Sequence, residues 1–230
     1  MIQELKKEFP NDIQVLVVEG RLSLVEGHYD AALAALEKAF ELRHNNYMLI
    51  ELVKAKMIAG QQEEGLAMME KWLQEYPQDI LVRTTLAEGY AKFGELEKAS
   101  DQFRIVIERD PNDGRMKNRL ARVFLELGRP HDAAPLAREA YELDPSDPAA
   151  ADTLGVSLLK TGNKSEALHV LSAAREAAGD EEAIRLHFSE ALAQNGKTSQ
   201  AIAELQDLLQ QAGDFPEREE AEKLLARLQD

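Results

Sequence analysis

A glycine recurs six times along the chain at a nearly constant interval, and this feature constrains the fold more than any other. Successive glycines are 33 or 34 residues apart. Five residues after each glycine stands another small residue, which is alanine in five cases and Gly65 in the sixth. A period of about 20–50 residues is typical of proteins built from stacked copies of one supersecondary unit. The repeated glycines are Gly27, Gly60, Gly94, Gly128, Gly162 and Gly196.

Each period predicts two helices joined by a tight turn. Apolar residues recur at helical spacing in segments 80–93 and 96–109. Gly94 stands between these segments, where a glycine ends a helix in the left-handed region without a Cβ clash. Proline in the following segment 110–113 cannot continue the second helix, and its Asp and Asn residues can cap the next one. A pair of this size cannot bury its apolar stripe alone, so we expect the pairs to stack.

The small residues, the glycine turn and the Asp-Pro-Asn ending resemble the tetratricopeptide repeat family. The resemblance implies an all-α fold: a right-handed α-solenoid of stacked helix-turn-helix repeats with a C-terminal capping helix. Residues 80–147 match the family pattern best. The matching residues are Leu86, Ala87, Tyr90, Gly94, Ala99, Phe103 and Pro111, followed by Leu120, Ala121, Phe124, Gly128, Ala133, Ala140 and Pro145.

The repeat register divides the chain into three segments. Residues 1–11 are predicted to be the second helix of a truncated preceding repeat, residues 12–215 six repeats, and residues 216–230 the capping helix. Ile2 and Leu5 lack the helix that would cover them in a complete repeat. We therefore expect this edge to fray or to mediate self-association.

The charge and composition exclude several functions. The net charge of −15 argues against nonspecific binding to nucleic acid or anionic lipid, because both are polyanions. No apolar run approaches the roughly 18 residues of a membrane span, so we expect no membrane insertion by this fragment. The absence of cysteine excludes disulfides and thiolate sites.

Residues with catalytic potential form no recognisable site. None of the five histidines pairs with another ligand type at a metal-binding spacing on one helix face, so they are expected to face solvent or turns. The glycine-rich phosphate motifs and the serine nucleophile elbow are absent. We therefore expect a protein that is not an enzyme and has no cofactor and no metal site.

The candidate binding residues follow from the family resemblance, which places the first helix of each repeat on the concave groove. In the fourth repeat Arg115, Asn118, Arg119 and Arg122 share one helical face, within a segment of net charge +4 over residues 115–138. Arginines of this kind grip carboxylates bidentately, so an acidic protein or peptide segment is the expected partner. The alternative is neutralisation within the chain by the carboxylates of flanking repeats. The other predicted groove residues are Lys54, Glu88 and Asp152.

The sequence does not predict the carboxylate clamp found in chaperone-docking members of the family. Arg115 and Arg119 fall on two basic positions of the clamp with which chaperone-docking members hold a peptide carboxylate. Ile50, Lys54 and Thr85 stand where the clamp needs a lysine and two asparagines. The sequence therefore predicts a groove of different specificity.

The second repeat contains an unusual pair of residues. Trp72 occupies a position that is alanine in three of the six repeats, and the same repeat has Gly65 where the others have alanine. We expect Trp72 to be buried between the second and third repeats, with Gly65 compensating for its volume.

The predicted function is non-catalytic binding of a protein or peptide on a preformed concave surface. Residues 186–225 also resemble the C-terminal part of tetratricopeptide repeat lipoproteins that accompany bacterial exosortase and exopolysaccharide systems. That resemblance implies a periplasmic scaffold for polysaccharide export or surface-protein sorting. The alternatives are a cytoplasmic adaptor and a self-assembling structural array.

Overall fold

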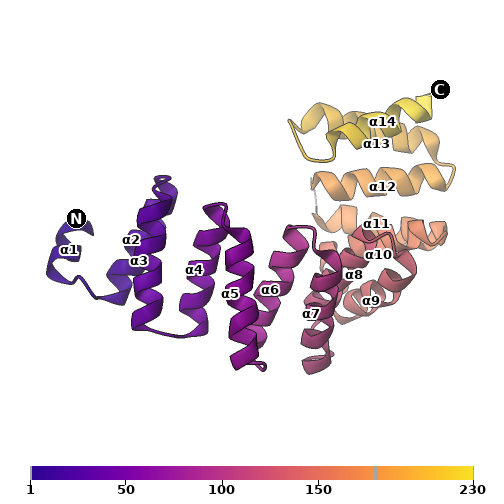
Figure 1. Ribbon diagram of the computed structural model, residues 1–230. Helices are drawn as coiled ribbons and strands as arrows, with labels where there is room; N and C mark the ends of the chain where they lie inside the picture. Colours follow the sequence, from indigo (N-terminus) through magenta and orange to yellow (C-terminus); the bar gives the residue numbers. More distant parts are fainter. Residues whose placement is uncertain (1, 179–180, 230) are drawn as a thin grey trace. The chain divides into compact units, whose positions relative to one another are not determined.

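The computed structural model describes residues 2–178 and 181–229, and these residues form fourteen α-helices and no β-strand (Figure 1). The chain consists of two compact units, and the boundary between them lies between Gln102 and Phe103. Unit 1 contains α1 (Ile2–Glu8), α2 (Ile13–Val25), α3 (Tyr29–Leu42), α4 (Asn46–Ile58), α5 (Gln62–Glu75), α6 (Ile80–Lys92) and the first half of α7 (Leu96–Arg109). Unit 2 contains the rest of α7, α8 (Gly114–Glu126), α9 (Pro130–Leu143), α10 (Pro148–Lys160), α11 (Lys164–Ala178), α12 (Glu182–Gln194), α13 (Thr198–Gln211) and α14 (Arg218–Gln229).

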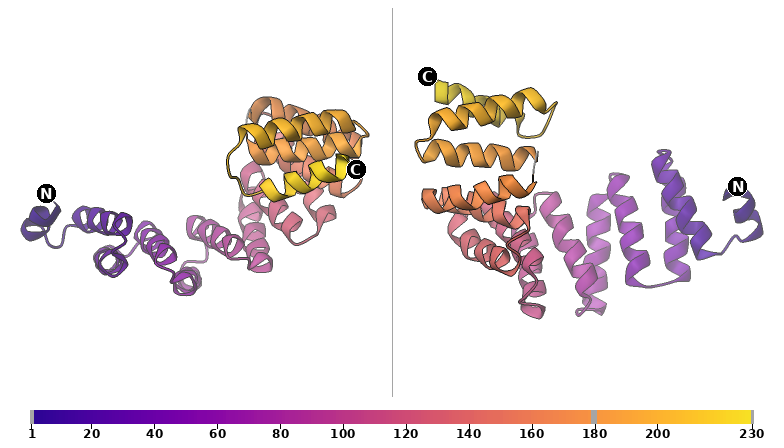
Figure 2. Two further views of the ribbon diagram at one scale, coloured as in Figure 1. Left: turned by 90° about the horizontal axis from the view of Figure 1, so that it is seen from above. Right: turned by 180° about the vertical axis from the view of Figure 1, so that it is seen from behind.

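Within each unit, consecutive helices pack against one another, and neighbouring helix pairs stack. In unit 1 the helices alternate between two rows when seen from above (Figure 2, left). In unit 2 the first helices α8, α10 and α12 are neighbours, and α14 lies against α12 and α13. The predicted all-α solenoid of helix pairs is confirmed, and the predicted segments 80–93 and 96–109 differ from α6 and α7 by no more than one residue at an end.

The turns and helix starts have the predicted chemistry. All six repeated glycines have positive φ, between 69° and 87°, a region that costs glycine no Cβ clash. Five first helices begin at an Asp or Asn whose side chain accepts hydrogen bonds from backbone N–H groups of the first turn. These caps are Asp12, Asn45, Asp79, Asp113 and Asp147.

Close approach between helices explains the repeated small residues. The alanines that follow the glycine turns are fully buried. On α10, a Cβ added to Gly155 would lie 2.3 Å from Cγ of Leu171 on α11. The small residues therefore set how closely the two helices of a pair approach.

The prediction about Trp72 and Gly65 is only half right. Trp72 is buried, with 8% of its surface exposed. Its indole ring packs against Tyr76 of its own repeat and against His44 of the first repeat, with centroid separations of 4.4 and 5.2 Å. Its Nε1 donates to Asp79, the cap of α6, at 2.9 Å, so the ring also contacts the first repeat and does not lie between the second and third repeats alone. A Cβ at Gly65 would instead meet Val53 of α4, 3.3 Å away. Gly65 therefore accommodates the partner helix of its own repeat, and the proposed compensation for Trp72 is wrong.

The N-terminal helix carries one exposed apolar residue of the predicted edge. Leu5 is exposed on α1, whereas the side chain of Ile2 lies outside the described residues. Lys6 of the same helix bonds to Glu19 of α2 at 2.5 Å. An ion pair thus links α1 to α2.

Candidate functional site

Three of the four residues predicted on α8 form an exposed cationic surface, which we name the arginine face: Arg115, Arg119 and Arg122. The helix begins at Asp113, whose carboxylate accepts from the N–H groups of Arg115 and Met116. The spacing of the three arginines places them along one side of this helix.

Asn118 differs from the arginines on the same helix. Only 7% of its surface is exposed, and its Oδ1 has no hydrogen-bond partner in the part of the chain that the structure describes. The side chain lies in the packed part of the helix and not on an open surface. Sequence spacing placed all four residues on one face, but packing around α8 covers this one.

Arg115 has a long ion pair, and Arg122 has none within the described residues. The Nε of Arg115 lies 3.9 Å from Asp113, and the Arg115 side chain is largely exposed. Arg122 has no ion pair with any residue in the described ranges. Exposed pairs of this kind contribute little to stability.

Asp152 has a histidine partner. Its Oδ1 lies 2.7 Å from Nδ1 of His187 on α12, and both side chains are partly buried. Burial lowers the pKa of His187, but the hydrogen bond to Asp152 and the charges of Asp152, Glu190 and Glu220 outweigh it, so the pKa is raised. The expectation that the histidines face solvent or turns is therefore wrong for His187.

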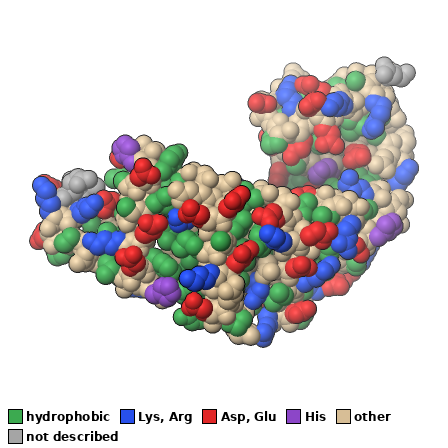
Figure 3. Space-filling model, viewed as in Figure 1, with side chains coloured by type: hydrophobic (Ala, Val, Ile, Leu, Met, Phe, Trp, Pro, Cys, Tyr) green, Lys and Arg blue, Asp and Glu red, His purple; other side chains and the backbone are tan. Residues whose placement is uncertain are grey.

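A pocket of about 230 Å³ lies beside this pair, and we name it the inner pocket. It is lined by residues of the first helices α8, α10 and α12 and of the segment that precedes α14. In Figure 3, acidic side chains gather around a histidine on the visible side of the C-terminal helices. The charged or titratable residues that line the pocket are Arg122, Asp152, Glu181, His187 and Glu217.

The other two predicted groove residues lie in unit 1. Lys54 is exposed on α4, and Glu88 is half-buried on α6. Of the seven predicted residues, Arg122 and Asp152 are the pair that lines the inner pocket.

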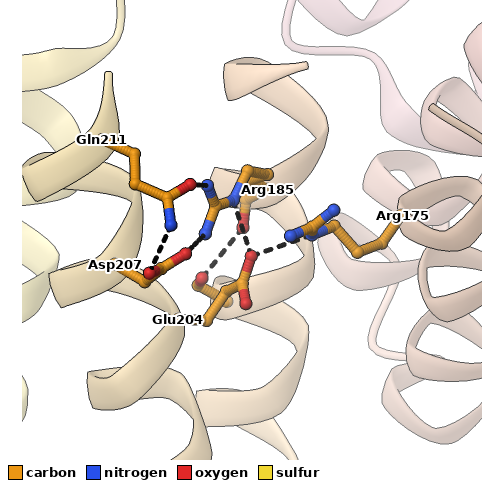
Figure 4. A network of polar contacts seen from close by, with 6 residues as sticks. Arg175, Arg185, Glu204, Asp207 and Gln211 are labelled. Carbon is orange, nitrogen blue, oxygen red and sulfur yellow. Dashed lines mark hydrogen bonds and ion pairs between the residues drawn. The ribbon is translucent and has the colours of Figure 1, made fainter. Parts of the chain in front are cut away.

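Sequence reasoning missed a buried arginine close to the C-terminal helices (Figure 4). Arg185 of α12 is 2% exposed at its side chain, and it donates to Glu204 at 2.7 Å and to Asp207 at 2.5 Å. Arg175 of α11 donates to the same Glu204 at 2.9 Å. The network joins α11, α12 and α13 and is structural, because its charges are directed at one another.

No group of three or more His, Asp or Glu side chains is placed to hold a metal ion within residues 2–178 and 181–229. None of the helices in these ranges is both long and apolar enough to cross a membrane.

The stacked helix pairs define a helical repeat protein of the α-solenoid class. Two family models, both described as tetratricopeptide repeat, match residues 84–148 and 124–186. A comparison with curated proteins found no match. Together the two matches cover residues 84–186, and over these residues the chain is similar to the tetratricopeptide repeat family.

Several solved structures are similar to the chain over most of its length. A tetratricopeptide repeat protein from Parabacteroides merdae has a TM-score of 0.77 and 15% identity, covering 94% of this chain and 86% of that one. MamA from Desulfovibrio magneticus has a TM-score of 0.64 and 17% identity, with coverages of 80% and 96%. YrrB, described as a TPR protein with an unusual peptide-binding site, has a TM-score of 0.63 and 21% identity, with coverages of 82% and 98%. At these identities the similarity shows the fold alone.

Proposed function

We propose that unit 2 binds an extended protein segment along the first helices α8, α10 and α12, without catalysis. Proteins of the tetratricopeptide repeat family are generally non-catalytic scaffolds that bind peptides or proteins. The observation that carries the proposal is the arginine face beside the inner pocket, two features contributed by neighbouring first helices. YrrB, which has the same fold, is described as having a peptide-binding site.

The arginine face favours an acidic partner. The three guanidinium groups are exposed on one helix, and planar guanidinium donors match carboxylates. Arg122 has no competing ion pair within the described residues, and Asp152 is engaged by His187. A carboxylate of the partner therefore does not have to displace Asp152 from an arginine.

Charge reversal on the arginine face tests this function. The probe is a fluorescein-labelled peptide of alternating aspartate and leucine, and its binding is followed by fluorescence anisotropy at low and high salt. We expect Arg119→Glu to weaken binding at least about tenfold, and we expect added salt to weaken binding by the unaltered protein.

Arg109→Glu is the matched control, because Arg109 is exposed at the end of the second helix α7. Arg175 is unsuitable for this purpose, since its substitution disturbs Glu204. Equal losses from Arg119→Glu and Arg109→Glu, or binding that ignores salt, would contradict the proposal.

The finer roles that the sequence suggested remain proposals of the same kind. A periplasmic lipoprotein role rests on the resemblance of residues 186–225 and would be supported by a lipid-attachment cysteine in an upstream sequence. A cytoplasmic adaptor is the alternative without such a cysteine. Self-association through α1 is supported by exposed Leu5, and sedimentation over a range of protein concentrations tests it.

A further inference from the structure

The charge of unit 2 changes sign along its first helices. The arginine face on α8 is cationic, whereas Glu181 and Glu217, just before α12 and α14, line the inner pocket. Glu181 is the residue before α12, and its side chain makes no capping hydrogen bond. Neither Glu181 nor Glu217 has an ion pair or side-chain hydrogen bond within the part of the chain that the structure describes.

Part of the pocket lining is aliphatic. Leu125 of α8, Val156 of α10 and Ile184 of α12 line the inner pocket, and Ile184 is almost fully buried. The volume of about 230 Å³ exceeds the roughly 150 Å³ of an engineered cavity that admits benzene. The pocket thus combines space for a long side chain, an apolar wall and unpaired carboxylates.

Lysine and arginine side chains have the complementary structure. Their methylene stems lie against apolar surface while the charged group remains beside water and anions. Asp152 is already held by His187, so Glu181 and Glu217 are the carboxylates available to such a group. Arg122 lines the pocket from α8 and would repel a cation there, which favours a position beside Glu181 and Glu217.

We propose that the inner pocket accepts a lysine or arginine side chain of the partner segment, next to the acidic residue that contacts the arginine face. This inference rests on the proposed function of unit 2 as a binding surface. The partner is thus a segment in which acidic and basic residues are close together, and the pocket selects the basic one.

Titration with a single residue isolates the pocket from the rest of the segment. The probe is N-acetyl-arginine methylamide, and citrulline in the same form is its neutral counterpart. Binding is followed by the ¹H–¹⁵N chemical shifts of the protein. We expect saturable shifts in the amides around the inner pocket with the arginine probe, and affinity at least tenfold weaker with citrulline.

Substitutions with matched charge changes locate the binding groups. The double variant Glu181→Gln/Glu217→Gln is expected to weaken binding of the arginine probe at least about fivefold, because both available carboxylates are lost. Glu142→Gln with Glu176→Gln is the control, since both residues are exposed on second helices outside the pocket. Arg122→Gln is expected to strengthen arginine binding about two- to fivefold by removing a like charge.

The outcomes separate this inference from the proposed function. Equal affinity for the arginine and citrulline probes, no shifts around the inner pocket, or equal losses in the two double variants would overturn the assignment of the pocket. The effect of Arg119→Glu on the acidic peptide would stand in each case. Failure of Arg119→Glu to weaken that peptide, with selective arginine binding retained, would instead overturn the acidic-segment proposal alone.

Discussion

Gly155 shows how strictly a single position on α10 is constrained. A Cβ at this residue would lie 2.3 Å from Cγ of Leu171, and Cγ is not the flexible end of the side chain. We expect Gly155→Ala to lower the free energy of unfolding by about 1–3 kcal/mol through overpacking. This loss outweighs the gain of up to about 1 kcal/mol from helix propensity. Chemical denaturation measures the difference.

The control for this prediction is Gly213→Ala in the loop before α14. A Cβ there would meet no atom within 4 Å, so we expect a change within about 0.5 kcal/mol. A gain in stability for Gly155→Ala would show that α10 and α11 separate without cost.

His187 predicts a pH dependence of stability. Its pKa is raised above the ordinary value of 6.5 because the bond to Asp152 and the charges of Asp152, Glu190 and Glu220 outweigh burial. The protonated form is thus favoured in the folded state. This contribution to stability is fully present below the ordinary pKa and is lost as the pH rises through the raised pKa.

Titration of the His187 ring protons by NMR checks the direction of the shift, and a midpoint above 6.5 is expected. As the pH rises through this range, the free energy of unfolding should fall less for His187→Gln than for the unaltered protein. A midpoint at or below 6.5 would show that burial dominates.

The contacts among α11, α12 and α13 depend on the buried side chain of Arg185. Replacing Arg185 with glutamine leaves Glu204 and Asp207 without their shared donor, and removing one partner of a buried ion pair costs about 3 kcal/mol or more. We expect Arg185→Gln to lower the free energy of unfolding by about that amount. Arg138→Gln, in an exposed pair with Glu166, should cost less than about 1 kcal/mol. Similar losses in the two variants would contradict the importance of burial.

The helices themselves were largely predictable from the sequence, because their signals are local. Glycine turns and Asp caps act within a few residues, and they placed α6 and α7 within a residue of the observed ends. The network around Arg185 was not predicted, because its members lie on different helices. Asp152 and His187 are 35 residues apart, which is close to one repeat period. This spacing was the sequence signal that could have predicted their contact. Spacing on one helix also could not show that Asn118 is buried, since burial depends on the neighbouring helices.

At the scale of the whole molecule, contacts between nearby helices dominate, so damage should remain local. In repeat proteins each unit contacts only its neighbours, and stability is transmitted through these interfaces. In unit 2, Leu224 and Ala221 of α14 are buried against Leu205 and Leu208 of α13, with Phe215 of the connecting loop in the same cluster. The covering of α13 by α14 is therefore a separable contribution to unit 2.

Leu224→Glu tests this local dependence, because it places a charge in the apolar contact between α13 and α14. Hydrogen exchange measured by mass spectrometry should accelerate most in α13 and α14, less in α10 and α8, and not at all in α2–α5 of unit 1. Ala226→Glu is the control, since Ala226 is exposed on the same helix. Acceleration of equal size in both units would mean that the chain unfolds as one cooperative body. If the two variants gave the same pattern, the buried contact of Leu224 would not be what protects α13.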